Sequence, residues 1–112
     1  MVHGGGPAAI EREWRMSVLV MVRAQARPGK GAAVVEMLAP FVGEDTGMEG
    51  CARIEMAVDA TDPDRVVLME EWTSAEAHKA NLAALEDAGG LDDFLALLAA
   101  APERTYYAPL GR

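Results

Sequence analysis

The pattern of apolar and polar positions predicts a strand, then a helix, in the first third of the chain. Residues 16–22 read MSVLVMV and are apolar on both alternating faces, which is typical of a central strand covered on both sides, about 16–26. Pro28-Gly29-Lys30-Gly31 breaks this strand. Apolar residues then recur at steps of three and four, which predicts a helix with a stripe of Val34, Met37, Leu38 and Phe41, ending near Pro40.

A β-hairpin is predicted next. Residues 51–59 alternate, so one face is expected to carry Ala52, Ile54, Met56 and Val58, and the other Cys51, Arg53, Glu55 and Asp59. Residues 61–64 (TDPD) form the predicted turn, and residues 65–72 return as the antiparallel partner strand. Alternation places Trp72 on one face with Val66, Leu68 and Glu70, and Glu71 on the other.

A split helix and a short strand complete the predicted fold. Thr73 followed by Glu76 resembles a capping box, and the stripe of the helix that it starts contains His78, Leu82 and Leu85. Gly89-Gly90 interrupts the helix, which restarts with Leu91, Phe94, Leu95 and Leu98 and ends before Pro102. Residues 105–108 have strand composition. This order predicts an α+β, ferredoxin-like βαββαβ fold with an antiparallel sheet and a split second helix.

The domain boundaries and the oligomeric state follow from what remains. Residues 1–14 carry a triple glycine, a proline and charged side chains, so we expect a flexible tail before a single domain of residues 15–112. A ferredoxin-like plan puts both helices on one face of the sheet, yet the first strand is apolar on both faces. We therefore expect a second copy to cover the other face, as a homodimer.

Composition narrows the class of protein. The 112 residues, 51% of them hydrophobic, suit one core, and 18 acidic against 10 basic residues (net charge −8) disfavour binding to nucleic acid. No apolar run approaches the roughly 20 residues that span a bilayer, so we expect no membrane partner. The single cysteine, Cys51, has no partner for an intrachain disulfide, and the first residues do not resemble a signal peptide, which predicts a cytoplasmic protein.

Common cofactor signatures are missing from the sequence. Neither a GxGxxG nor a GxxxxGK loop is present, so a nucleotide cofactor is not implied. Two histidines and one cysteine do not make a His/Cys metal site. Cys51 is expected to be a small buried side chain rather than a reactive thiol.

Candidate chemistry gathers around the end of the hairpin. Trp72 either caps the core or lines a pocket into which its indole N–H donates. Glu70 is either solvated or ion-paired, with Arg23 as a possible partner, or buried with a raised pKa that would make it a catalytic candidate; the first reading is favoured. His78 is either a packed residue or a general base, and Asn81, one turn on, is placed to orient a substrate oxygen.

The last strand contributes a further pair. Tyr106 and Tyr107 alternate, so one is expected to face inward and the other outward, with packing as the default role of each.

Several short motifs resemble the antibiotic biosynthesis monooxygenase (ABM) family. They are Pro28-Gly29-Lys30, Gly50-Cys51, Asp62-Pro63 and, above all, the segment EEWTSAEA of residues 70–77. The likeness spans about residues 16–108. It implies a dimeric α+β barrel. Because some members oxygenate polyphenols, anthrones or quinols without metal, flavin or haem, it also implies oxidation of an aromatic substrate with molecular oxygen as co-substrate and no cofactor.

The resemblance also implies roles for individual residues. Trp72 matches the family's tryptophan, while the family's histidine nine residues later is Asn81 here, and His78 stands three residues before that position. We therefore expect His78 to take a proton, with Asn81 and Trp72 orienting a small aromatic substrate. The predicted substrate-binding residues are Trp72, Glu70, Phe94, Met56 and Tyr106. The alternative is a noncatalytic module on the same barrel that binds a small ligand or another protein.

Overall fold

The computed structural model describes residues 17–110. Its elements are β1 (Val18–Gln25), α2 (Gly31–Leu38), the short 3₁₀ helix η1 (Ala39–Phe41), β2 (Cys51–Asp59), β3 (Asp62–Trp72), α3 (Ala75–Asp87), α4 (Asp92–Ala96) and β4 (Glu103–Tyr107). The tail predicted for residues 1–14 lies outside the described residues.

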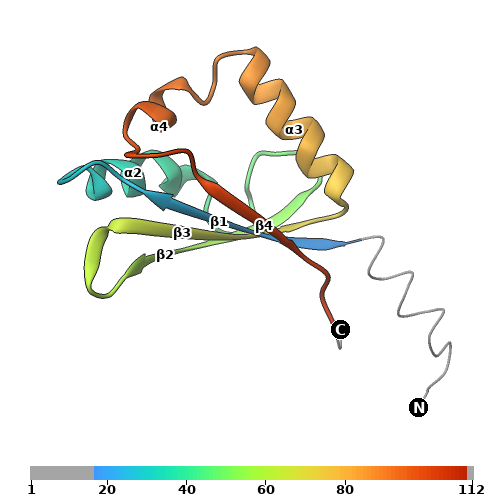
Figure 1. Ribbon diagram of the computed structural model, residues 1–112. Coiled ribbons are helices and arrows are strands. Elements are labelled where there is room, and N and C mark those ends of the chain that lie inside the picture. The colour runs from blue at the N-terminus through green and yellow to red at the C-terminus, as the bar shows by residue number, and fades with distance from the viewer. Residues whose placement is uncertain (1–16, 111–112) are drawn as a thin grey trace, which may run out of the picture.

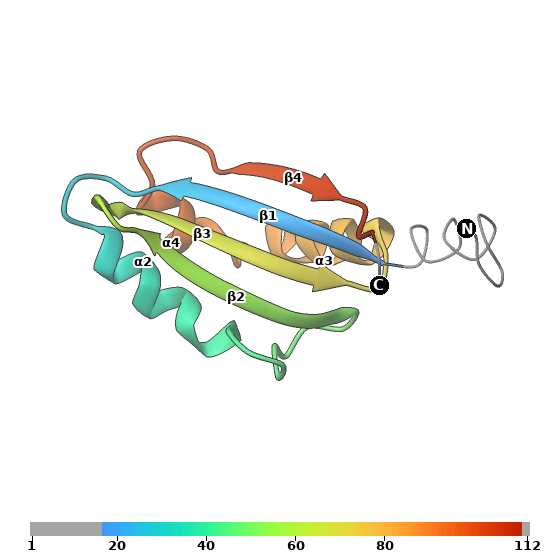
Figure 2. The same ribbon diagram turned by 90° about the horizontal axis from the view of Figure 1, so that it is seen from below.

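The four strands form one antiparallel sheet in the order β2-β3-β1-β4. The helices lie together on one face of this sheet, and Figure 1 shows the opposite face bare. Figure 2, seen from below, shows the four strands side by side with no helix in front of them. The predicted α+β, ferredoxin-like βαββαβ fold is therefore confirmed, and α3 and α4 are the two parts of its split second helix.

Burial along β1 shows which face of the sheet holds the core. Its buried residues alternate with half-buried ones. The buried set, Val18, Val20, Val22 and Ala24, faces the helices and packs with side chains of β3, whereas Leu19 and Met21 lie on the bare face. Residues 17–110 thus cover β1 on one face, although its sequence is apolar on both.

The register of β2 corrects one prediction from strict alternation. Cys51 lies opposite Trp72 and Arg53 lies opposite Glu71, so the pairing shifts at Ala52. Because residues paired across strands share a face, this irregularity places Cys51 on the same side as Trp72, where it packs against the core. The prediction that put Cys51 on the polar face was wrong for this reason.

The hairpin turn is also tighter than predicted. β3 begins at Asp62, so the residues predicted as a turn are partly in the strand. The Asp59 carboxylate accepts hydrogen bonds from both the backbone N–H (2.7 Å) and the hydroxyl (2.8 Å) of Thr61, which closes a short connection.

The start of α3 differs from the predicted capping box. Ser74, not Thr73, is the N-cap: its backbone is extended, and its hydroxyl oxygen accepts from the N–H of Ala77 at 3.0 Å. Thr73 is held elsewhere, because its N–H donates to the carbonyl of Gly50 at 2.8 Å. The helix therefore begins one residue later, directly beside the end of β3.

Close contact fixes the position of α2 over the sheet. The Asp64 carboxylate accepts from the N–H groups of Gly29 (3.0 Å) and Gly31 (2.8 Å), which ties the start of α2 to β3. A Cβ at residue 31 would overlap the backbone carbonyl of Pro63, so only glycine fits there. This attachment sets the distance between α2 and the sheet, and hence the space beneath the helix.

Candidate functional site

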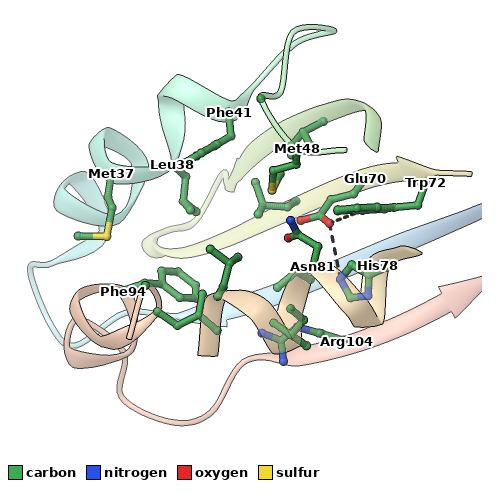
Figure 3. A pocket seen from close by; sticks show the side chains of 18 residues that line it. Met37, Leu38, Phe41, Met48, Glu70, Trp72, His78, Asn81, Phe94 and Arg104 are labelled. Atoms are coloured by element: carbon green, nitrogen blue, oxygen red, sulfur yellow. Dashed lines mark hydrogen bonds and ion pairs between the residues drawn. The ribbon is translucent and has the colours of Figure 1, made fainter. Parts of the chain in front are cut away.

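A cavity of about 380 Å³ lies between the covered face of the sheet and the helical layer (Figure 3). Side chains of β1, β2 and β3 form its floor, α2 and η1 form one wall, and α3 and α4 form the other. The lining is mostly apolar: Val22, Met37, Leu38, Phe41, Met48, Ile54, Leu68, Trp72, Leu82, Leu85, Leu91 and Phe94. Its volume falls in the range of about 300–1,000 Å³ that is typical of small-molecule sites.

Polar groups gather at one end of the cavity, where Glu70, Trp72, His78 and Asn81 lie together, away from Met37 and Phe94 (Figure 3). The indole N–H of Trp72 donates to Glu70 Oε1 at 2.8 Å, and the Nε2 atom of His78 lies 3.9 Å from the same oxygen. All three side chains are buried. The end of β3 and the first turn of α3 therefore combine into one polar cluster.

The second ring nitrogen of His78 points away from the cavity. Its Nδ1 atom lies 2.8 Å from the hydroxyl of Tyr106 on β4. The imidazole meets both aromatic neighbours edge to face, with ring centroids 5.1 Å from Trp72 and 5.4 Å from Tyr106. Three elements thus fix the orientation of the imidazole.

Burial shifts both titrating groups of the cluster toward their neutral forms. It raises the pKa of Glu70, and the Trp72 hydrogen bond and the charge of Arg104 oppose this only in part. It lowers the pKa of His78, and the positive charges of Arg104 and Lys79 lower it further. At neutral pH the imidazole is therefore unprotonated, which is the form that a proton acceptor needs.

Some polar atoms of the cluster remain available to a ligand. Within residues 17–110, no buried side-chain nitrogen or oxygen lacks a hydrogen-bond partner. Glu70 Oε2, His78 Nε2 and the Asn81 amide make no hydrogen bond to a described residue, so these atoms are not fully enclosed. Because their side chains line the cavity, they offer it one carboxyl oxygen, one ring nitrogen and one amide.

Five of the predicted site residues line this one cavity: His78, Asn81, Trp72, Glu70 and Phe94. Two others do not. Met56 packs against both core clusters, and Tyr106 stands behind His78, with 39% of its surface exposed. Tyr107 lies opposite Leu19 on the bare face, so one tyrosine faces inward and the other outward, as predicted.

The favoured interpretation of Glu70, as solvated or ion-paired with a residue such as Arg23, was wrong. Arg23 lies opposite Val67, which puts it on the bare face of the sheet, where it contacts Glu103 and Thr105. Glu70 is on the covered face and is neither solvated nor ion-paired with an arginine. The cation whose charge affects the pKa of Glu70 is Arg104, which the sequence analysis missed.

Alternation in the last strand could have revealed Arg104, because residues 104 and 106 share a face. Met48 was missed for another reason: it belongs to the irregular segment between η1 and β2, which has no periodicity to interpret.

In the described part of the chain, no group of three or more His, Cys, Asp or Glu side chains is arranged to hold a metal ion. None of the helices between residues 17 and 110 has the length and apolar character needed to cross a membrane.

Comparison with models of protein families shows to which family the chain belongs. The family model described as "Antibiotic biosynthesis monooxygenase" (ABM) matches residues 17–86. The chain belongs to the ABM family. The match covers β1, β2, β3, α2 and most of α3, and therefore includes the whole polar cluster, whereas Arg104 and Tyr106 lie beyond it. No curated protein matches the chain.

Solved structures agree with this assignment. A protein of Chloroflexus aurantiacus J-10-fl assigned to the antibiotic biosynthesis monooxygenases is 30% identical, with a TM-score of 0.68 over 86% of this chain and 95% of its own. A similarly assigned protein of Nitrosomonas europaea is 20% identical, with a TM-score of 0.72 over 86% and 92% of the two chains. At 17% identity and a TM-score of 0.65, over 86% and 95%, an alanine mutant of SnoaB, a cofactor-independent oxygenase from Streptomyces nogalater, shares the fold.

Proposed function

We propose that this ABM protein is a cofactor-independent monooxygenase that oxidises an aromatic, quinol-type substrate with molecular oxygen. The observation that carries the proposal is the buried imidazole of His78, which lines the polar end of an otherwise apolar cavity. Membership of the family and the shared fold with SnoaB, a cofactor-independent oxygenase, support it.

The proposed chemistry begins with removal of a proton. The aromatic body of the substrate lies between the apolar walls, the Nε2 atom of His78 accepts the proton, and the Asn81 amide donates to the resulting oxyanion. The electron-rich anion then reduces O₂. In an anthrone-type substrate the ring methylene becomes a carbonyl: one oxygen atom enters the product, and the other takes up the two methylene hydrogens and leaves as water.

This role requires one tautomer of His78. If Nε2 is to accept a proton, the ring hydrogen must be on Nδ1, which then donates to the Tyr106 hydroxyl at 2.8 Å. Tyr106 is thus a positioning residue that holds the base in its active form. Trp72 keeps its indole N–H on Glu70 and presents its ring to the substrate.

Oxygen uptake tests the proposal. Metal-free protein is given a panel of polyphenols and hydroquinones, and uptake is compared with that of His78→Ala and of the control Glu86→Gln, an exposed position further along α3. General-base catalysis typically contributes about a hundredfold to ten-thousandfold in rate, so His78→Ala is expected to lose that much while the control loses nothing. No uptake by the wild type across the panel would contradict the oxygenase, and unchanged uptake in His78→Ala would reassign the base.

One observation favours the second candidate function, a noncatalytic binder of a small apolar ligand. Both ring nitrogens of His78 face protein side chains, Tyr106 at 2.8 Å and Glu70 at 3.9 Å, as expected of a packed histidine. Calorimetry with the same panel under argon separates the two functions, because a binder gives heat of binding but no oxygen uptake.

We also infer that the bare face of the sheet packs against a second copy. At its centre Met21 lies opposite Met69, and Leu19 and Val67 flank them, all half-buried within this chain alone. Sedimentation velocity at micromolar concentration should show a dimer, and Met69→Glu should give a monomer while Ala83→Glu, on the exposed side of α3, stays dimeric. A wild-type protein that sediments as a monomer would refute the inference.

The cytoplasmic location stays a prediction.

A further inference from the structure

Arg104 adds a charged group to the cavity that the roles assigned above do not use. It lies on β4 opposite Val22, so its side chain is on the covered face of the sheet. It is half-buried and lines the cavity together with His78 and Asn81 (Figure 3). The last strand therefore delivers a guanidinium to a site whose other polar side chains are neutral or acidic.

Among residues 17–110, no side chain pairs with this guanidinium. Arg23, Arg53 and Arg65 each form an ion pair with a carboxylate, and Arg27 donates to the carbonyl of Ala96. The Arg104 side chain has no ion pair and no hydrogen bond to any residue from 17 to 110, in a chain with 18 acidic and 10 basic residues. Where acids outnumber bases, an arginine held in a cavity without an acidic partner is suited to an anion from outside.

The charge of Arg104 acts on the titrating groups around His78. It offsets part of the rise that burial causes in the pKa of Glu70 and of Tyr106, and it adds to the fall in the pKa of His78. Lys79 adds to the positive potential at His78. The Glu70 carboxyl is the opposing group, but burial favours its neutral form, which reduces its repulsion of an anion.

The chemistry of the guanidinium points to a carboxylate. Arginine is charged at every working pH, and its planar array of N–H donors matches the two oxygens of a carboxylate. A substrate carboxylate is charged before the reaction, so its contact with Arg104 strengthens binding of the substrate itself. The oxyanion proposed at Asn81 is different, because it develops only after proton removal. The apolar walls meanwhile select a flat hydrophobic body.

We propose that Arg104 is the specificity-determining residue of the cavity and binds the carboxylate of an aromatic acid. This inference rests on the proposed function only in treating the cavity as the substrate site. It narrows the substrate class from quinol-type aromatics to those that carry a carboxylate.

The test is a comparison of two ligands that differ only in charge, a dihydroxynaphthoate and its methyl ester. Affinities are measured by calorimetry under argon for the wild type, Arg104→Gln and Arg104→Lys, with Arg27→Gln, at an exposed position before α2, as a control. We expect the wild type and the control to bind the carboxylate about tenfold to a hundredfold more tightly than the ester. Arg104→Gln should lose this preference with unchanged affinity for the ester, and Arg104→Lys should keep part of it.

Salt dependence gives a second measurement that needs no variant. Carboxylate binding should weaken as ionic strength rises, and ester binding should not. Equal affinities in the wild type, failure of both ligands to bind, or a preference that survives in Arg104→Gln would each overturn the proposal. Tight, Arg104-dependent binding without oxygen uptake would instead refute the oxygenase and leave the carboxylate site standing. Oxygen uptake with the ester but not with the carboxylate would refute the carboxylate site and leave the oxygenase standing.

Discussion

Replacing Trp72 with phenylalanine tests the contact that organises the polar end of the cavity. The substitution keeps an aromatic ring but removes the N–H that donates to Glu70 Oε1 at 2.8 Å. Both residues are buried, Trp72 at 1% exposure and Glu70 at 8%, so water replaces the lost bond poorly. The cost therefore depends on whether the carboxyl group is charged.

The magnitude follows from the kind of bond removed. A hydrogen bond to a charged group contributes about 1.5–3 kcal/mol to stability, and a neutral one about 0.5–1.5 kcal/mol. The smaller ring adds roughly 1 kcal/mol of lost packing, which is the same in any background. In Glu70→Gln the amide oxygen still accepts but carries no charge. The double-mutant cycle should therefore give a coupling energy of about 1 kcal/mol or more when Glu70 is ionised.

The raised pKa of Glu70 determines how the stability of the protein changes with pH. Because the pKa of Glu70 is raised in the folded state, the folded protein holds its proton more tightly than the unfolded chain does. Stability therefore falls as pH rises from the ordinary carboxyl value of 4.5 through the raised one, and Glu70→Gln lacks this fall. The cost of Trp72→Phe grows over the same interval, since the bond that it removes becomes charge-assisted.

Urea denaturation followed by circular dichroism at several pH values measures all four proteins of the cycle. The protein concentration is held fixed, because the stability of an oligomer depends on it. If Trp72→Phe costs the same in both backgrounds and at every pH, the indole N–H does not stabilise a charged Glu70, and the electrostatic account of the cluster is wrong.

Three further predictions concern the fold and the base. Ser74→Ala should lower the free energy of unfolding in urea by about 1 kcal/mol through loss of the α3 N-cap, and Thr73→Ala should lower it much less. Equal losses would favour Thr73 as the cap, as the capping-box prediction had it. Gly31→Ala should prevent folding or lower the thermal midpoint far more than Gly29→Ala, which has free space and only an unfavourable positive φ, and similar midpoints would disprove the close contact. Oxygen uptake should stay constant down to a pH below about 6.5 and then fall, because His78 must be unprotonated and its pKa is lowered; a fall centred above that value would argue against His78.

Periodicity and the turn residues between the periodic segments were enough to predict the fold. The step of two in β3, and the steps of three and four in α2 and α3, follow directly from backbone geometry, so they identify these elements and the faces that they bury. The sequence of β1 is apolar on both faces, so only the structure showed which one the helices cover. Local side-chain competition was harder to foresee. Ser74 replaced Thr73 as the cap because the Gly50 carbonyl holds Thr73, and a register shift at Ala52 turned Cys51 to the core side; both depend on contacts between segments far apart in the chain.

The residues of the candidate site were likewise predictable in part from the sequence and in part only from the tertiary structure. From the sequence we could place Glu70 and Trp72 on one face and His78 and Asn81 on the next helix, because these positions depend on spacing within single elements. Only the tertiary structure decided that they meet in one cavity, that Glu70 contacts Trp72 and His78 rather than Arg23, and that Arg104 joins them while Met56 does not. The physical reason is that the spacing of residues fixes the direction of a side chain relative to its own backbone, whereas its burial, its partners and hence its pKa depend on which other elements the fold packs against it.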